Sequence, residues 1–191
     1  MTVPEAELVG LAIRGDHDAA ARLIARIRPG VVRYCRAHLG RVGGAYTTAD
    51  DVAQEVCLAI LRSLPRFREE GRPFSAFAYR IAAHKVTDAQ RAATRHLAVA
   101  PADALLDQPD SAPGPEEQAV ATDLARQLSR LLGHLSRSQR EIIVLRVAVG
   151  LAADDVGAVL GMSAAAVRMA QSRALAHLRT LVRDTRDEVP A

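Results

Sequence analysis

Residues 154–179 read DDVGAVLGMSAAAVRMAQSRALAHLR, and this run decides the fold of the C-terminal part of the chain. Its apolar residues recur every three or four positions on both sides of Gly161, a residue type that readily adopts a left-handed turn. Ser163 comes two residues later and is of the type that caps helix N-termini. The spacing predicts a short helix over about 153–160, a tight turn, and a second helix from Ser163 to about Val182. Two helices joined in this way are typical of a helix-turn-helix.

The second helix of this pair has two different faces. A small inner face would let the two helices cross closely, while an outer face rich in donors suits the major groove of DNA. The inner face consists of Val167, Ala170, Ala174, Leu178 and Leu181, and the outer face of Arg168, Ser172 and Arg179, flanked by Met169 and Arg173. A plain helical hairpin with solvated arginines is the alternative that this pattern leaves open.

Helical periodicity also dominates the first hundred residues. Thr48 and Asp51 have the spacing of a capping box, which predicts a helix over about 49–64. A polar loop over 65–73 follows, and then one long helix over about 74–95. Upstream, a helix from about Asp18 is expected to break or bend at Pro29-Gly30 before it resumes over 31–39.

Between the two halves the periodicity fails. Residues 101–115, PADALLDQPDSAPGP, are rich in proline and aspartate and offer little to bury, which predicts a flexible linker. Helices resume over about 116–132 and 138–149. Two overlapping capping boxes fit the start of the second one, Ser136 with Gln139 and Ser138 with Glu141. The predicted fold class is all-α, with two small helical domains on a flexible linker.

Composition and charge narrow the class of protein. The chain has 191 residues, of which 49% are hydrophobic and only 3% aromatic, so its core is expected to be aliphatic and helical. No apolar run approaches the roughly 20 residues of a membrane span, and no secretory signal is visible, which favours the cytoplasm. Residues 1–100 hold 15 Lys and Arg against 10 Asp and Glu, residues 101–134 hold 2 against 6, and residues 135–191 hold 8 against 6. Two basic ends around an acidic middle suggest two lobes that contact an anion.

The two long N-terminal helices have different outer faces. The helix over 74–95 has one basic stripe with Phe77 at its edge, a pattern suited to phosphate contact and base stacking. The stripe consists of Arg80, His84, Thr87, Arg91 and Arg95. A solvated polar face is the alternative. On 49–64, acidic and amide side chains surround two leucines that point away from the apolar side, which marks a protein interface unless the leucines cover a neighbouring helix. These residues are Asp50, Asp51, Gln54, Glu55, Leu58 and Leu61.

Four ordered blocks of sequence resemble the sigma-70 family. They are TADDVAQEV at 48–56, LPRFR at 64–68, FSAFAYRIA at 74–82 and LSRSQREIIVLR at 135–146. Since no domain separates the two lobes, the chain resembles the extracytoplasmic-function (ECF) group, which keeps only regions 2 and 4. The runs DDVAQEVCLA at 50–59 and IAAHKV at 81–86 are similar to the actinobacterial sigma-D type.

The resemblance implies a function and a domain plan. It implies a sigma factor that binds core RNA polymerase, through the β′ and β subunits, and directs transcription initiation at promoter DNA. It also implies an anti-sigma factor as a further partner. The domains would be a region 2-like domain at 1–96, a linker at 97–115, a region 4-like domain at 116–183 and a tail at 184–191.

The resemblance also assigns roles to individual residues. The face at 50–61 would contact the clamp helices of the β′ subunit. Contacts to the −10 element are expected from Phe67, Phe77, Arg80, His84, Thr87, Arg91 and Arg95. Contacts to the −35 element are expected from Ser163, Ala164, Ala165, Arg168, Met169, Gln171, Ser172 and Arg173.

Two other classes of function compete with this interpretation. A stand-alone repressor would share the helix-turn-helix but would need no acidic interface helix, and it would bind duplex DNA tightly without polymerase. An enzyme would need an acid–base pair such as Asp50 with Asp51 or His84 with Asp88, yet neither pair comes with a nucleophile or a glycine-rich cradle. Cys35 and Cys57 are expected to be small buried residues, and no His/Cys spacing resembles a zinc site. We therefore expect no catalytic residue, cofactor, metal or small-molecule substrate.

Overall fold

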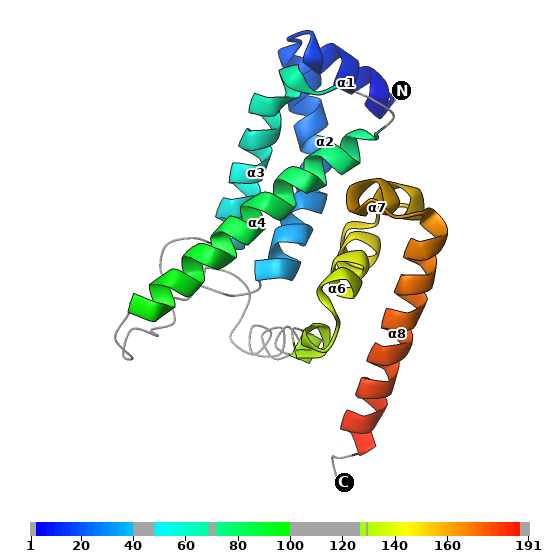
Figure 1. Cartoon of the computed structure of the whole chain (residues 1–191). Coiled ribbons are helices and arrows are strands. Elements are labelled where there is room, and N and C mark those ends of the chain that lie inside the picture. The colour runs from blue at the N-terminus through cyan, green and yellow to red at the C-terminus, as the bar shows by residue number, and fades with distance from the viewer. Residues whose placement is uncertain (1–2, 40–47, 69–71, 100–126, 129, 188–191) are drawn as a thin grey trace, which may run out of the picture.

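The described part of the chain is entirely helical, as the sequence predicts. A computed structural model describes residues 3–39, 48–68, 72–99, 127–128 and 130–187. The N-terminal lobe comprises α1 (Glu5–Ile13), α2 (His17–Leu39), α3 (Ala49–Ser63), the short 3-10 helix η1 (Leu64–Arg66) and α4 (Phe74–Val99). The C-terminal lobe comprises α6 (Arg137–Ile143), the π-helix η2 (Val144–Val149), α7 (Ala153–Leu160) and α8 (Ala164–Asp187). Figure 1 shows the two lobes side by side, with α4 and α8 as the longest helices of each.

Two of the predicted capping boxes form. The Thr48 hydroxyl accepts a hydrogen bond from the Asp51 backbone N–H at 3.1 Å, and the Asp51 carboxylate accepts from the Thr48 N–H at 2.8 Å. Ser136 and Gln139 form the same reciprocal pair at the start of α6. The overlapping box of Ser138 does not form, because α6 already begins at Arg137 and places Ser138 inside the helix. Local side-chain chemistry thus fixes where α3 and α6 begin.

Of the break or bend expected at Pro29-Gly30, the break does not occur, because α2 continues from His17 to Leu39. Proline removes one backbone hydrogen bond within the helix, and buried residues lie on both sides of it, Leu23 before and Val31 after. Gly30 is buried, and a Cβ placed on it would collide with the hydroxyl of Tyr79 from α4. Gly30 therefore leaves room for the Tyr79 hydroxyl, and it marks a contact instead of a helix end.

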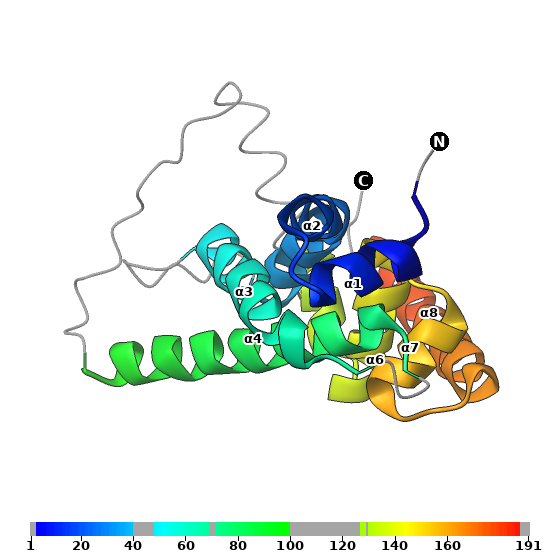
Figure 2. The same ribbon diagram turned by 90° about the horizontal axis from the view of Figure 1, so that it is seen from above.

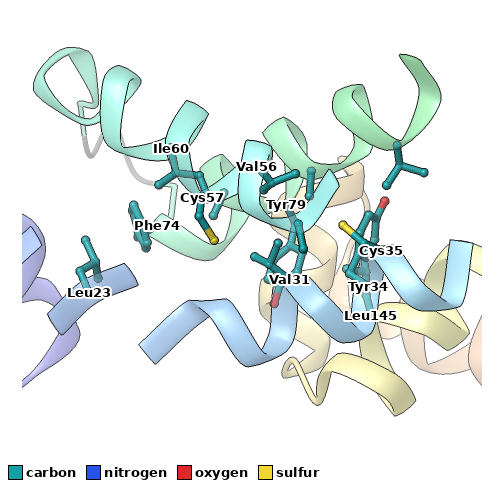
Figure 3. Close-up of a cluster of buried hydrophobic side chains, with 14 of the residues drawn as sticks. Leu23, Val31, Tyr34, Cys35, Val56, Cys57, Ile60, Phe74, Tyr79 and Leu145 are labelled. Atoms are coloured by element: carbon teal, nitrogen blue, oxygen red, sulfur yellow. The ribbon is translucent and has the colours of Figure 1, made fainter. Parts of the chain in front are cut away.

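The core of the N-terminal lobe lies between α2, α3 and α4, and it combines aliphatic side chains with the buried rings of Tyr34, Phe67, Phe74 and Tyr79. Figure 3 shows Val31 and Cys35 of α2 facing Val56 and Ile60 of α3. Burial raises the pKa of the Cys35 thiol to about 12, and it also raises the pKa of Cys57. Both thiols therefore stay protonated and behave as small apolar side chains.

The helix-turn-helix forms as predicted. Gly161 has a left-handed backbone with φ of 70°, and the Met162 N–H donates to the Gly157 carbonyl at 2.9 Å. The turn is so tight that a Cβ on Gly157 would lie 2.5 Å from the Met162 carbonyl oxygen. Ser163 caps α8 by accepting from the Ala166 N–H at 3.2 Å. Val167 and Ala174 of α8 are fully buried, which confirms the predicted inner face.

The lobes contact each other mainly where α2 packs against η2 and α4 packs against α7 (Figures 1 and 2), and Tyr34 of α2 also bonds Glu141 of α6. One continuous cluster of buried apolar residues has members in both lobes, from Leu8 to Val167. Most of the predicted linker and of the helix expected over 116–132 lie outside the described residues, although residues 127–128 and 130–133 are helical. Sequence periodicity did not predict that the two lobes pack together.

Candidate functional site

The first predicted surface is the outer face of α3. Leu58 and Leu61 are 44% and 36% exposed, so they do not cover a neighbouring helix. Gln54 and Glu55 lie exposed on the same helix. The inner residues of α3, including Val52 and Val56, are buried. The helix therefore presents an exposed patch of leucines beside polar and acidic groups, which suits a protein interface.

The acidic groups of this face already have partners within the lobe. Arg36 donates to both carboxylate oxygens of Asp50 at 2.9 and 2.6 Å, and the bonds from Arg36 hold the pKa of Asp50 below its usual range. Hydrogen bonds from Thr48 lower the pKa of Asp51, which caps the helix. Glu55 accepts from Lys85 at 3.1 Å. All three pairs are exposed, so solvent screens them and a partner can compete for them at small cost.

The second predicted surface runs along α4. Arg80, His84, Arg91 and Arg95 are all exposed. Thr87 is half-buried, and its hydroxyl donates back to the Ala83 carbonyl at 2.8 Å. A shallow, open depression of about 280 Å³ lies near the start of the stripe, and its walls are Phe77, Arg80, Ile81 and His84. An aromatic ring, an apolar side chain and two basic groups around a hollow offer stacking and phosphate contact together.

Phe67 does not share this surface. It is 6% exposed and belongs to the buried core, with its ring centroid 5.8 Å from that of Phe74 and 4.8 Å from that of Phe77. Phe67 follows η1 in extended conformation, which turns its side chain inward. The ring of Phe67 is therefore buried in this structure, and its expected contact with an unpaired base stays a prediction. Phe77 is half-buried and keeps one edge at the depression.

The third predicted surface is the N-terminal half of α8. Arg168, Met169, Ser172 and Arg173 are exposed there, and Met169 is 62% exposed. Arg168 lies 3.8 Å from Asp154 of α7 in a solvated pair. Ala165 is exposed and Ala164 half-buried, while the Ser163 hydroxyl is used as the helix cap. The outer face therefore has the small and basic residues that a groove-binding helix requires.

Gln171 is held by a residue that the sequence analysis missed. The Arg146 guanidinium donates from Nε to the Gln171 side-chain oxygen at 3.0 Å and from Nη1 to the Leu151 carbonyl. Arg146 of η2 thus joins α8 to the segment that follows η2. Helical periodicity carries no signal for a contact between positions 25 residues apart, so only the folded arrangement reveals it.

Two further features of the described residues concern metal binding and membrane-spanning helices. Within the described ranges, no group of three or more His, Cys, Asp or Glu side chains is arranged to hold a metal ion. No helix in that part of the chain is long and apolar enough to cross a membrane.

Comparisons with known proteins connect these surfaces to one family. Residues 23–96 match the family model for sigma-70 region 2, and residues 125–178 match that for sigma-70 region 4. The chain is 49% identical to the ECF RNA polymerase sigma factor ShbA of Streptomyces griseus over 177 residues, which are 91% of this chain and 93% of that protein. It is also 49% identical to the ECF sigma factor SigD of Mycobacterium tuberculosis over 172 residues, 90% of this chain and 81% of that protein.

A solved structure supports the same assignment. The fold is similar to that of CnrH in complex with the cytosolic domain of CnrY, with a TM-score of 0.68 and 27% identity over 94% of this chain and 97% of that chain. The region 2 match covers α3 and most of α4, and the region 4 match covers the helix-turn-helix. The chain therefore belongs to the ECF group of sigma-70-family RNA polymerase sigma factors, which bind RNA polymerase and recognise promoters.

Proposed function

We propose that each of the three surfaces carries out a different part of the function of a sigma factor. The outer face of α3 binds the clamp helices of the polymerase β′ subunit, α4 holds the −10 strand, and the N-terminal half of α8 reads the −35 element. The observation that carries this proposal is that the three groups of residues lie on three separate helices with exposed outer faces. Region 2 would extend over about 1–96 and region 4 over about 116–183.

On this proposal the polymerase interface joins apolar and acidic contacts. Leu58 and Leu61 supply buried area, while Glu55 and Asp50 steer association with a basic partner. On binding, Glu55 would break its ion pair with Lys85 and form one with a basic group of polymerase. Asp51 acts mainly as the helix cap, so its contribution to binding is indirect.

The DNA surfaces are expected to act at different steps. Arg168 and Arg173 would contact the duplex −35 element, and Arg80, Arg91 and Arg95 the backbone of the −10 strand. A base taken out of the stack costs a few kcal/mol, which stacking beside Phe77 in the depression offsets. His84 lines the same depression from about two turns further along α4.

Substitutions on α8 and on α4 should therefore impair different steps of transcription initiation. Arg168→Ala and Arg173→Ala should each weaken docking of the holoenzyme on a duplex promoter by about 1–3 kcal/mol, because each removes a phosphate or base contact. Phe77→Ala should leave docking nearly intact but slow strand opening. Permanganate reactivity of −10 thymines on a duplex and on a pre-melted bubble separates the two steps.

The bubble template should rescue Phe77→Ala and leave the arginine variants impaired. Arg183→Ala is the matched control, because Arg183 is an exposed arginine at the far end of the same helix. If the bubble rescues neither class of variant, the division of roles between α4 and α8 is wrong.

We infer three further properties with the function. The chain has no catalytic activity of its own and needs no cofactor or metal. It acts in the cytoplasm, where RNA polymerase works. An anti-sigma factor is a further partner, an inference supported by the similarity to CnrH, whose solved structure contains the cytosolic domain of CnrY.

A further inference from the structure

Lys85 connects two of the three candidate surfaces. It is the only lysine of the chain, and it lies on α4, the helix that carries the basic stripe. Its ammonium donates to Glu55 Oε2 of α3 at 3.1 Å. The two helices pack against each other, as Figure 2 shows from above. One ion pair therefore links the outer face of α3 with the surface that runs along α4.

This ion pair can exchange its partners easily. The side chains of Lys85 and Glu55 are 38% and 58% exposed, so water screens their attraction. A lysine ammonium is a point charge on a flexible stem and can turn to another anion. The pair of Arg36 with Asp50 differs, because its guanidinium donates to both carboxylate oxygens, at 2.9 and 2.6 Å. Of the two pairs, the one between Lys85 and Glu55 is the easier to break.

Lys85 also lies at the border of the depression on α4. It follows Ile81 by four residues, and side chains four residues apart are neighbours on the surface of a helix. Ile81 forms one wall of the depression, and His84, the residue before Lys85, forms another. A strand bound in the depression would therefore bring its phosphates close to the Lys85 side chain.

We propose that Lys85 exchanges partners when the chain binds RNA polymerase. In the free chain its ammonium is paired with Glu55. When Glu55 pairs with a basic group of polymerase instead, Lys85 is released and binds a phosphate of the single-stranded −10 DNA. This inference rests on the proposed roles of α3 and α4, and it adds Lys85 to the residues that contact DNA.

The exchange makes the two binding steps depend on each other. Polymerase has to break the internal ion pair, so Lys85 competes with polymerase for Glu55 and lowers the affinity of the chain for it. Once polymerase is bound, α4 carries one more unpaired cation beside the depression, which strengthens its attraction for a nucleic-acid backbone. Lys85 should thus oppose the first step and favour the second, a combination that a purely structural residue would not produce.

The first measurement is the affinity of the full chain for core polymerase without DNA. Lys85→Met removes the charge but keeps an unbranched apolar stem, and it should bind about two- to fivefold more tightly, the range expected for an exposed ion pair. In a Glu55→Gln background the same substitution should have no effect, because no ion pair is left to break. Arg22→Met is the matched control, because it removes an exposed cation from a different helix, α2.

The second measurement uses the assembled holoenzyme and a single-stranded oligonucleotide that carries the −10 element of a promoter it transcribes. Each phosphate neutralised on a single strand contributes about 0.7 to the slope of log K against log salt concentration. Lys85→Met should make this slope shallower by about that amount and weaken the complex at low salt. Arg22→Met should keep the slope of the wild type. Circular dichroism checks that each variant keeps its helices.

Three results would overturn the proposal: Lys85→Met that binds core polymerase no more tightly than the wild type, a gain in affinity that persists in the Glu55→Gln background, or an unchanged salt slope. The second of these would indicate general charge repulsion instead of an exchange. Failure of the proposed function gives a different pattern, because Glu55→Lys combined with Leu58→Lys would then keep wild-type affinity for polymerase. If only the exchange is wrong, that variant loses affinity while Lys85→Met does not gain it.

Discussion

Glu55→Lys combined with Leu58→Lys should lower the affinity for core RNA polymerase by at least about a hundredfold. Each substitution removes a contact expected near the centre of the interface, where single residues commonly contribute 2 kcal/mol or more. The double variant also places two cations opposite a basic partner, which adds repulsion. Both positions are exposed in the free chain, so the lobe should keep its stability.

Affinity can be measured by titrating labelled chain with core polymerase, and the same samples can be followed by run-off transcription. Glu7→Lys is the matched control, because it reverses an exposed acid on α1, outside the proposed interface. Wild-type affinity in the double variant would remove α3 from the polymerase interface.

Asp51 is deliberately left out of this variant. Its carboxylate accepts hydrogen bonds from the Thr48 N–H and hydroxyl, so reversing its charge would also remove a helix cap. Loss of such a cap costs about 0.5–2 kcal/mol of stability. With a lysine at this position, a loss of polymerase binding could not be distinguished from a loss of folding.

Phe67→Ala should destabilise the N-terminal lobe by about 3–5 kcal/mol, because it empties a buried aromatic site that packs against Phe74 and Phe77. A loss of that size is a large part of the total free energy of unfolding of a domain, so the variant should be mostly impaired in every activity. Chemical denaturation followed by circular dichroism measures the change.

Phe77→Ala provides the comparison on the same cluster. Phe77 is half-buried, so its loss should cost less than that of Phe67. A loss below about 1 kcal/mol for Phe67→Ala would mean that Phe67 is not a core residue, and would favour its predicted role as a stacking partner for DNA.

The sequence predicts the features that depend on residues close together in the chain, namely helix ends and helix faces. Thr48, Ser136, Ser163 and Gly161 fix helix ends through hydrogen bonds or backbone conformation within a few residues, so their spacing is informative. The periodic faces of α3, α4 and α8 are predictable for the same reason, since one helix decides which side is apolar. The three candidate surfaces follow from these faces.

Contacts between distant segments are not predictable in this way. Phe67 lies after a short 3-10 helix, where no periodicity indicates which way a side chain points. Pro29 suggests a break or a bend, yet α2 continues through it, and Gly30 next to it lies against Tyr79 of another helix. Glu141 fits a local capping box but instead binds Tyr34, 107 positions away. The docking of the lobes depends on such long-range pairs.

Run-off transcription from genomic fragments of the source organism, by core RNA polymerase with and without this chain, tests the central claim most directly. The account predicts discrete transcripts only when the chain is present, and none with Glu55→Lys/Leu58→Lys. It also predicts that the free chain footprints duplex promoter DNA weakly, because each lobe offers few phosphate contacts and polymerase is needed to set their spacing. Tight footprinting by the free chain, together with transcripts that its addition leaves unchanged, would contradict the account and favour a stand-alone DNA-binding repressor.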